Sequence, residues 1–173
     1  MTDVIDTETL RFERELAAPI DTVWRYLVEA DLRARWFMGG PTEAHAGGKL
    51  GFTLAHANLS DEPVATPERY ADRQGRSWSE TITRIDPPRL LAFTWDDGKA
   101  GEVTFELEDV GAGRTRLTLT HSGLRGPEDA RNFGGGWGAH LAVLEKRLAG
   151  APVADFWALH AEAEARAARA VGL

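Results

Sequence analysis

The stretch that decides the fold is Pro127–Gly150, PEDARNFGGGWGAHLAVLEKRLAG. Its large apolar residues recur at intervals of three and four, which places them on one face of an α-helix. These residues are Phe133, Trp137, Leu141, Leu144 and Leu148. The opposite face is charged at Glu145–Arg147. The pattern predicts one long helix with a single buried face.

Four glycines in this stretch, Gly134, Gly135, Gly136 and Gly138, oppose helix formation. Each lowers helix stability by about 0.8–1 kcal/mol relative to alanine. Burial of each large apolar side chain stabilises the helix by about 1.5–3 kcal/mol, which outweighs that loss. We therefore expect a helix that forms only against a partner surface. The glycines either leave space for a ligand beside Trp137 or let another backbone approach closely.

The composition is that of a soluble globular protein with one core. Apolar residues make up 43% and charged residues 27% of the 173 residues, which is enough apolar material for one buried interior. The absence of cysteine excludes disulfides, thiolate metal sites and a cysteine nucleophile, and it fits the cytoplasm.

The net charge and the hydropathy of the chain indicate which classes of partner it is not expected to bind, namely nucleic acids and membranes. The formal net charge of −7 disfavours nucleic acid, because binding to a polyanion needs a basic face. No apolar run approaches the length that crosses a bilayer, and residues 1–12 lack the basic start and apolar core of a leader. We expect a cytoplasmic protein with no nucleic-acid or membrane partner.

An antiparallel meander is predicted ahead of the long helix. Apolar and polar residues alternate in six segments, as in strands with one buried face. The segments are residues 8–17, 49–56, 77–85, 91–95, 103–107 and 117–121. Such a sheet needs a cover, and a helix of about 34 Å can cross six strands spaced about 4.8 Å apart.

The connections of the meander have patterns of their own. Residues 19–28 and 30–36 predict two short helices after the first strand. Asp96-Asp97-Gly98 predicts a hairpin turn. Residues 57–76 are polar and rich in turn formers, and they predict a surface loop.

The tail, residues 151–173, predicts an alanine-rich helix. Its apolar face comprises Val153, Phe156, Trp157 and His160, and Pro152 suits a helix start. Such a helix either packs on its own domain or forms the contact of a homodimer. We divide the chain into a domain of residues 1–150 and a helical extension of residues 151–173.

The order of these elements carries residues that resemble a known family. The matching pieces are Ala18-Pro19 with Val23-Trp24, Trp36-Phe37, Ile85–Leu90 with Phe93-Thr94-Trp95, Val103–Leu107, Gly113–Leu124, and Gly136-Trp137 with Leu141 and Leu144. Over about residues 10–149 the chain resembles the AHSA1-like family (activator of Hsp90 ATPase homologue 1-like) of the Bet v 1/START-like, or SRPBCC, superfamily. The 57–76 segment is longer than the family needs, and the tail lies outside the match.

This resemblance implies an α+β helix-grip fold, in which a curved antiparallel sheet of about six strands wraps the long helix around an apolar cavity. The candidate ligand-binding residues are Trp36, Phe37, Phe52, Phe93, Trp95, Phe105, His121, Trp137 and Leu141. Large apolar side chains fill cores as well as line ligand sites, so plain core packing is the alternative for each.

Polar residues give weak support for catalysis. The five histidines, His45, His56, His121, His140 and His160, stand at no metal-binding spacing, so we expect no metal and no cofactor. By strand parity His121 faces inward, either as a hydrogen-bonded core residue or toward a cavity. Glu80 and Arg84 share a parity and form either an inward polar pair or part of the solvated face.

Three functions are compatible with the sequence. The preferred one is a small binding protein that holds an apolar or amphipathic small molecule between the long helix and the sheet. The second is a protein-interaction module similar to the Hsp90 activators. The third is a cyclase-like enzyme that uses His121, Glu80 or Arg84. We expect a binding protein rather than an enzyme.

Overall fold

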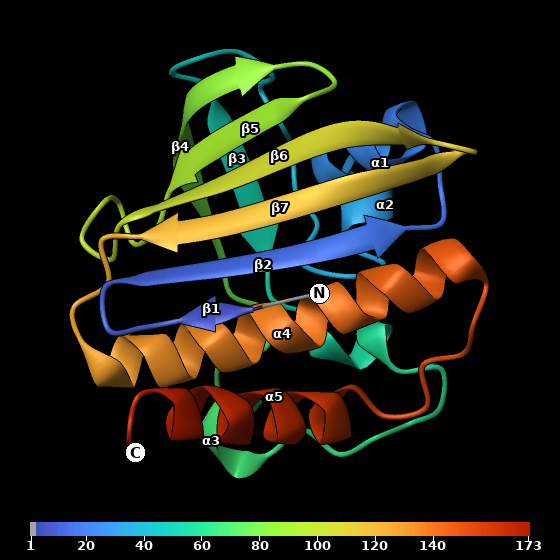
Figure 1. The fold of residues 1–173 in the computed structure, drawn as a ribbon. Coiled ribbons are helices and arrows are strands. Elements are labelled where there is room, and N and C mark those ends of the chain that lie inside the picture. Colours follow the sequence, from blue (N-terminus) through green and yellow to red (C-terminus); the bar gives the residue numbers. More distant parts are fainter. Residues whose placement is uncertain (1–2) are drawn as a thin grey trace.

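The computed structural model describes residues 3–173, which form one curved sheet and its covering helices (Figure 1). The sheet is antiparallel, with the strand order β1-β2-β7-β6-β5-β4-β3. Its strands are β1 (Val4–Ile5), β2 (Thr9–Leu16), β3 (Lys49–Thr53), β4 (Ser77–Asp86), β5 (Leu90–Thr94), β6 (Glu102–Gly111) and β7 (Arg114–Ser122). The expectation about a leader rests partly on residues 1–2, which lie outside the described residues.

Four of the helices within residues 3–173 follow the predicted order, and α3 lies in the segment predicted to be a loop. The helices are α1 (Ile20–Val28), α2 (Ala30–Arg33), α3 (Glu68–Ala71), α4 (Pro127–Ala149) and α5 (Phe156–Ala170). Two short helices follow the first long strand, and a long helix and a tail helix follow the meander. The predicted α+β helix-grip fold is confirmed, with seven strands instead of about six because β1 adds a two-residue edge strand.

Helix α4 forms as the opening stretch predicts. Pro127 occupies its first turn, and Gly150 ends it in the left-handed conformation at φ 68°. Trp137, Leu141 and Leu144 are buried against the core. In Figure 1 α4 runs along the β1–β2 side of the sheet. The helix therefore packs against the sheet, which is the partner surface that a helix rich in glycine needs for stability.

The chain leaves the sheet earlier than the alternation after Lys49 predicts. Strand β3 ends at Thr53, and a 3₁₀ turn, η1, spans His56–Leu59. His56 therefore does not continue the strand face of Phe52, and the predicted extension to residue 56 is wrong. The hairpin prediction is confirmed, since Asp96 and Asp97 both adopt positive φ between β5 and β6.

Helix α5 packs along α4 on a glycine face (Figure 1). A Cβ built on Gly134 would lie 2.9 Å from Cβ of Ala167, and one on Gly138 would lie 2.9 Å from Cβ of Ala163. A Cβ on Gly135 would lie 2.9 Å from both Cα and Cβ of Glu164. These three glycines thus serve the close approach of two helices.

Gly136 has a different environment. No atom lies within 4 Å of the position of its Cβ, and the residue borders the cavity described below. Gly136 therefore leaves open space, whereas its three neighbours serve the close approach of α5.

The 57–76 segment is not a detached surface loop. It includes most of the η1 turn and all of α3, and Leu59 is fully buried. Arg147 of α4 pairs with Asp61 at 2.7 Å, and the Asp61 carboxylate accepts a hydrogen bond from the Val153 amide at 2.6 Å. Ring stacking of Tyr70 on Trp157 joins the segment to α5. The segment lies mostly at the surface, as predicted, and its anchors could not be predicted because they come from distant residues.

Two neighbouring glycine substitutions should have opposite effects on the free energy of unfolding. Gly135→Ala should lower it by about 1–3 kcal/mol, because the new methyl meets the α5 backbone at Glu164. Gly136→Ala should raise it by about 0.8–1 kcal/mol, because its methyl meets open space and alanine favours the helix. Urea unfolding of both variants measures the difference, and equal changes of the same sign would contradict the packing described.

Candidate functional site

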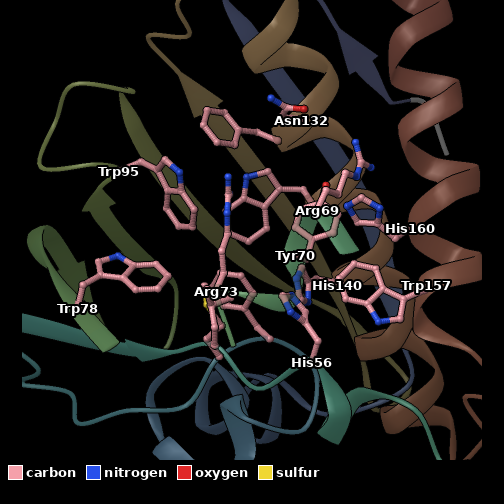
Figure 2. Close-up of a pocket in the computed structure, with 16 residues that line it drawn as sticks. His56, Arg69, Tyr70, Arg73, Trp78, Trp95, Asn132, His140, Trp157 and His160 are labelled. Carbon is pink, nitrogen blue, oxygen red and sulfur yellow. The ribbon is translucent and has the colours of Figure 1, made fainter. Parts of the chain in front are cut away.

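A cavity of about 430 Å³ lies at the junction of α4, α5, the 57–76 segment and the inner face of the sheet (Figure 2). Its lining residues come from all four parts of the fold, including Trp95 of the β5–β6 turn region, Trp137 of α4, Tyr70 of α3 and Trp157 of α5. Most of the wall is aromatic. The cavity thus exists only when the tail and the 57–76 segment are in place.

One side of the cavity is a cluster of packed rings. The ring centroid of Trp137 lies 4.9 Å from that of Phe37 and 5.6 Å from that of Trp95. Phe133 meets Trp95 edge to face at 6.0 Å. Figure 2 shows Trp95 and Trp78 together on the side away from α5. This side offers flat apolar surface to a ligand.

Buried Arg33 fixes the loop that brings Phe37 to the cavity. Its Nε donates to the Met38 carbonyl at 2.8 Å, and its Nη2 donates to the Gly40 and Gly51 carbonyls at 2.8 and 2.7 Å. Burial lowers the pKa of Arg33 to about 10, so the guanidinium stays charged at neutral pH. Backbone carbonyls stabilise this charge, because no carboxylate within residues 3–173 pairs with it.

The opposite side of the cavity holds three histidines, His56, His140 and His160 (Figure 2). Nδ1 of His140 lies 2.8 Å from the Trp36 carbonyl, which can only accept, so Nδ1 carries the proton and Nε2 is an acceptor. Burial, together with nearby His56, lowers the pKa of His140 to about 3. At neutral pH His140 is therefore an uncharged acceptor in the wall.

His56 has the complementary tautomer. Its backbone amide donates to Oε1 of Gln74 at 3.0 Å, which orients the Gln74 amide so that Nε2 donates to His56 Nδ1 at 2.9 Å. The proton of the His56 ring therefore lies on Nε2. Burial lowers the pKa of His56 to about 4. Neutral His56 and His140 give this side of the cavity one hydrogen-bond donor and one acceptor.

Three of the nine predicted site residues line this cavity, namely Phe37, Trp95 and Trp137. The other six lie in the surrounding core instead, namely Trp36, Phe52, Phe93, Phe105, His121 and Leu141. Strand parity and helix spacing identify which side chains face inward. They do not tell which inward side chains border empty space and which touch one another.

His121 faces inward as its strand parity predicts, and it is fully buried. Trp137 Nε1 donates to His121 Nδ1 at 3.0 Å, and His121 Nε2 donates to the Ala100 carbonyl at 2.8 Å. Burial lowers the pKa of His121 to about 4. With both ring nitrogens engaged inside the protein, His121 has the geometry of a core residue that orients the Trp137 indole.

Glu80 and Arg84 do not form an inward pair. Glu80 is buried, and it accepts hydrogen bonds from the Trp78 indole, the Thr94 hydroxyl and the amides of the following turn. Arg84 lies on the outer face beside Glu102. The pairing of β4 with β5 shifts register between Ile82 and Arg84, so one parity does not hold along the whole strand.

The side of the cavity formed by the 57–76 segment and the tail was not predicted from the sequence. Tyr70, Arg73 and His56 come from the segment interpreted as a loop with a strand end. Trp157 and His160 come from the apolar face of the tail, which faces α4 and the 57–76 segment of its own chain. The sequence offered two signals, an aromatic residue inside a polar segment and an amphipathic tail with no assigned partner. Only the contacts in the structure show that the two form one wall.

Two classes of site are absent from residues 3–173. No group of three or more His, Asp or Glu side chains in that part of the chain is arranged to hold a metal ion. No helix there is both long enough and apolar enough to span a bilayer.

Comparison with known families identifies the chain. The model of the family described as "Activator of Hsp90 ATPase homolog 1-like protein" matches residues 17–149. The chain belongs to this family. Comparison with curated proteins gives no match.

Solved structures include several that this AHSA1-like protein resembles. A protein from Bordetella parapertussis, known from a solution structure, is 40% identical, with a TM-score of 0.81 over 96% of this chain and 88% of that one. CalU16 from Micromonospora echinospora is 20% identical, with a TM-score of 0.69 over 99% and 98%. A conserved protein of unknown function from Enterococcus faecalis is 21% identical, with a TM-score of 0.69 over 98% and 92%. The last two likenesses show the shared fold.

The buried histidines predict that the protein loses stability on mild acidification. The folded pKa values of His56, His121 and His140 lie at about 4, 4 and 3, below the ordinary value of 6.5. Below about pH 6.5 these histidines are protonated in the unfolded chain but stay neutral in the folded one. Their contribution to the free energy of unfolding is therefore complete above that pH and declines toward pH 4.

Urea unfolding between pH 7.5 and pH 4.5 measures this decline. We expect a loss on the order of 1 kcal/mol per pH unit for each buried histidine. His121→Gln should lower stability at pH 7.5 and make the pH dependence shallower. A free energy of unfolding that does not change between pH 7.5 and pH 4.5 would contradict the burial of neutral imidazoles.

Proposed function

We propose that this AHSA1-like protein binds an apolar or amphipathic small molecule in the cavity between α4, α5, the 57–76 segment and the sheet. The supporting observation is a cavity of about 430 Å³ that combines aromatic walls with polar side chains, among them three histidines on one side. Pockets for small ligands measure roughly 300–1,000 Å³ and combine apolar walls with a few orienting polar groups. The open space beside Gly136 agrees with this use.

The polar side of the cavity supports an amphipathic ligand rather than a purely apolar one. His140 Nε2 has no hydrogen-bond partner within residues 3–173, and its tautomer makes it an acceptor. A ligand hydroxyl or amide that reaches this nitrogen would satisfy it, while the apolar body of the ligand lies against Trp95 and Trp137. We propose the cytoplasm as the location, in keeping with the lack of cysteine.

A second candidate is a role as a co-chaperone-like interaction module, because the matching family is described by its likeness to an activator of the Hsp90 ATPase. The Aha1 dimer from Colwellia psychrerythraea has a similar fold, with a TM-score of 0.60 at 16% identity over 81% of this chain and 95% of that one. A pull-down with Hsp90 and an ATPase assay separate the candidates, since absence of binding and of any rate change would remove this one.

Homodimerisation also remains a proposal. The apolar face of α5 predicted for a dimer contact, Phe156, Trp157 and His160, is buried within its own chain. A dimer through α5 would therefore use the opposite, charged face. The division into a domain of residues 1–150 and an extension of residues 151–173 stays a prediction.

Native mass spectrometry of gently purified protein, with extraction of bound small molecules, tests the proposed binding directly. A bound molecule, or binding of neutral apolar probes such as 2-naphthamide, is the expected result. A protein that is always empty and that binds no member of a broad apolar panel would contradict it.

Filling the cavity provides a sharper test with a matched control. Gly136→Leu projects a side chain into open space at the cavity wall, so the affinity for 2-naphthamide should fall by about tenfold or more, equivalent to about 1.4 kcal/mol. Ala149→Leu adds the same side chain at the exposed end of α4 and should leave the affinity unchanged. Equal affinities of both variants and the unmodified protein, measured by tryptophan fluorescence, would place the binding elsewhere.

A further inference from the structure

The cavity differs from the rest of the protein in its charge. The chain carries a formal net charge of −7, yet the residues that line the cavity include two arginines and no carboxylate. Arg69 is neutralised by its ion pair with Glu164 of α5. Arg73 pairs with no carboxylate within residues 3–173, and its guanidinium carbon lies 6.0 Å from the ring centroid of Tyr70. One cation at the cavity is therefore without a counter-ion.

The position of Arg73 places this cation within reach of a bound molecule. In Figure 2 its side chain lies in the middle of the lined space, between Trp95 on one side and the histidines on the other. Burial lowers the pKa values of His56 and His140 to about 4 and about 3, so these rings contribute no positive charge at neutral pH. Within the described lining, Arg73 is the positive group available to a ligand.

The walls on both sides of Arg73 consist of aromatic rings, stacked on one side and tilted by 58° on the other. Tyr70 stacks on Trp157 with centroids 5.1 Å apart and planes 17° apart. Trp95 and Trp137 lie on the other side, with centroids 5.6 Å apart. Aromatic faces and edges pack well against a planar ring system. An arginine beside such walls is suited to a carboxylate, which it can bind with two parallel hydrogen bonds.

We propose that the ligand of the cavity is an aromatic carboxylic acid, with its ring against Trp95 and Trp137 and its carboxylate bound by Arg73. This proposal rests on the proposed function and adds the chemical class of the ligand. Arg73 binds the anion, and neutral His140 and His56 remain for a further polar substituent. The exposed end of Arg73 keeps the carboxylate near solvent, which limits the cost of removing it from water.

The test compares two probes that differ in charge, 2-naphthoate and 2-naphthamide, on the full chain at pH 7.5. Isothermal titration calorimetry should show that the acid binds about tenfold more tightly than the amide. Arg73→Gln should remove this preference, so that the acid and the amide bind this variant with similar affinity. Arg76→Gln, at an exposed arginine three residues away that does not line the cavity, should keep the preference.

The possible outcomes show whether the proposed ligand class, the role of Arg73 or the binding function itself is wrong. Equal binding of both probes to the unmodified protein would overturn the acid preference and leave the proposed function in place. A preference that survives in Arg73→Gln would overturn the assignment of Arg73. Failure of both probes to bind would contradict the aromatic-acid proposal, and the broad apolar panel described above would then decide whether the binding function fails as well. Because Arg73 is exposed, thermal melting should show an intact fold in its variant, and Arg73→Lys should recover part of the preference.

Discussion

The structure depends on the close contact between the glycine face of α4 and the stretch Ala163–Ala167 of α5. Gly134, Gly135 and Gly138 leave no room for a side chain against Ala163, Glu164 and Ala167. A helix with so many glycines is unstable alone, so α4 needs apolar packing on the sheet side and backbone packing on the α5 side. This double contact turns α4 into a shared wall between the sheet and the tail.

That contact also determines where the cavity forms. With α5 held against α4, Trp157 and His160 face Tyr70 of the 57–76 segment, and Asp61 anchors the segment to Arg147. The aromatic residues of the sheet and α4 form the opposite wall. The cavity is therefore closed on one side by the 57–76 segment and by α5, which lies outside the matched family region. Its ligand preference should depend on those parts.

The sequence predicts the scaffold well because its signals are local. The periodicity of Pro127–Gly150, the alternation of the strands and the Asp96-Asp97-Gly98 turn each depend on neighbouring residues, and the structure agrees with them except at the end of β3. Buried Arg33 and the β4 register shift cannot be predicted in this way. The contacts of Arg33 include the Gly51 carbonyl, which is distant in sequence. The register shift depends on one extra residue in the β4–β5 ladder.

The site was predictable only in part for the same reason. Phe37, Trp95 and Trp137 were found because inward apolar residues are recognisable, whereas Phe93 and Phe105 share that pattern and simply fill the core. Tyr70 and Arg73 lie in a polar segment whose contacts come from the tail. Composition alone therefore does not predict that such a segment forms part of a binding site.

The most direct test of a ligand site in this cavity is a ¹⁵N-HSQC titration with 2-naphthoate that follows the indole N–H signals. The six tryptophans report on different places, since Trp78, Trp95, Trp137 and Trp157 line the cavity while Trp24 and Trp36 do not. A ligand in the cavity should shift the signals of Trp95 and Trp157 saturably and leave those of Trp24 and Trp36 unchanged. Shifts confined to Trp24 and Trp36, or no saturable shift at all, would contradict a ligand site at the junction of α4, α5 and the 57–76 segment.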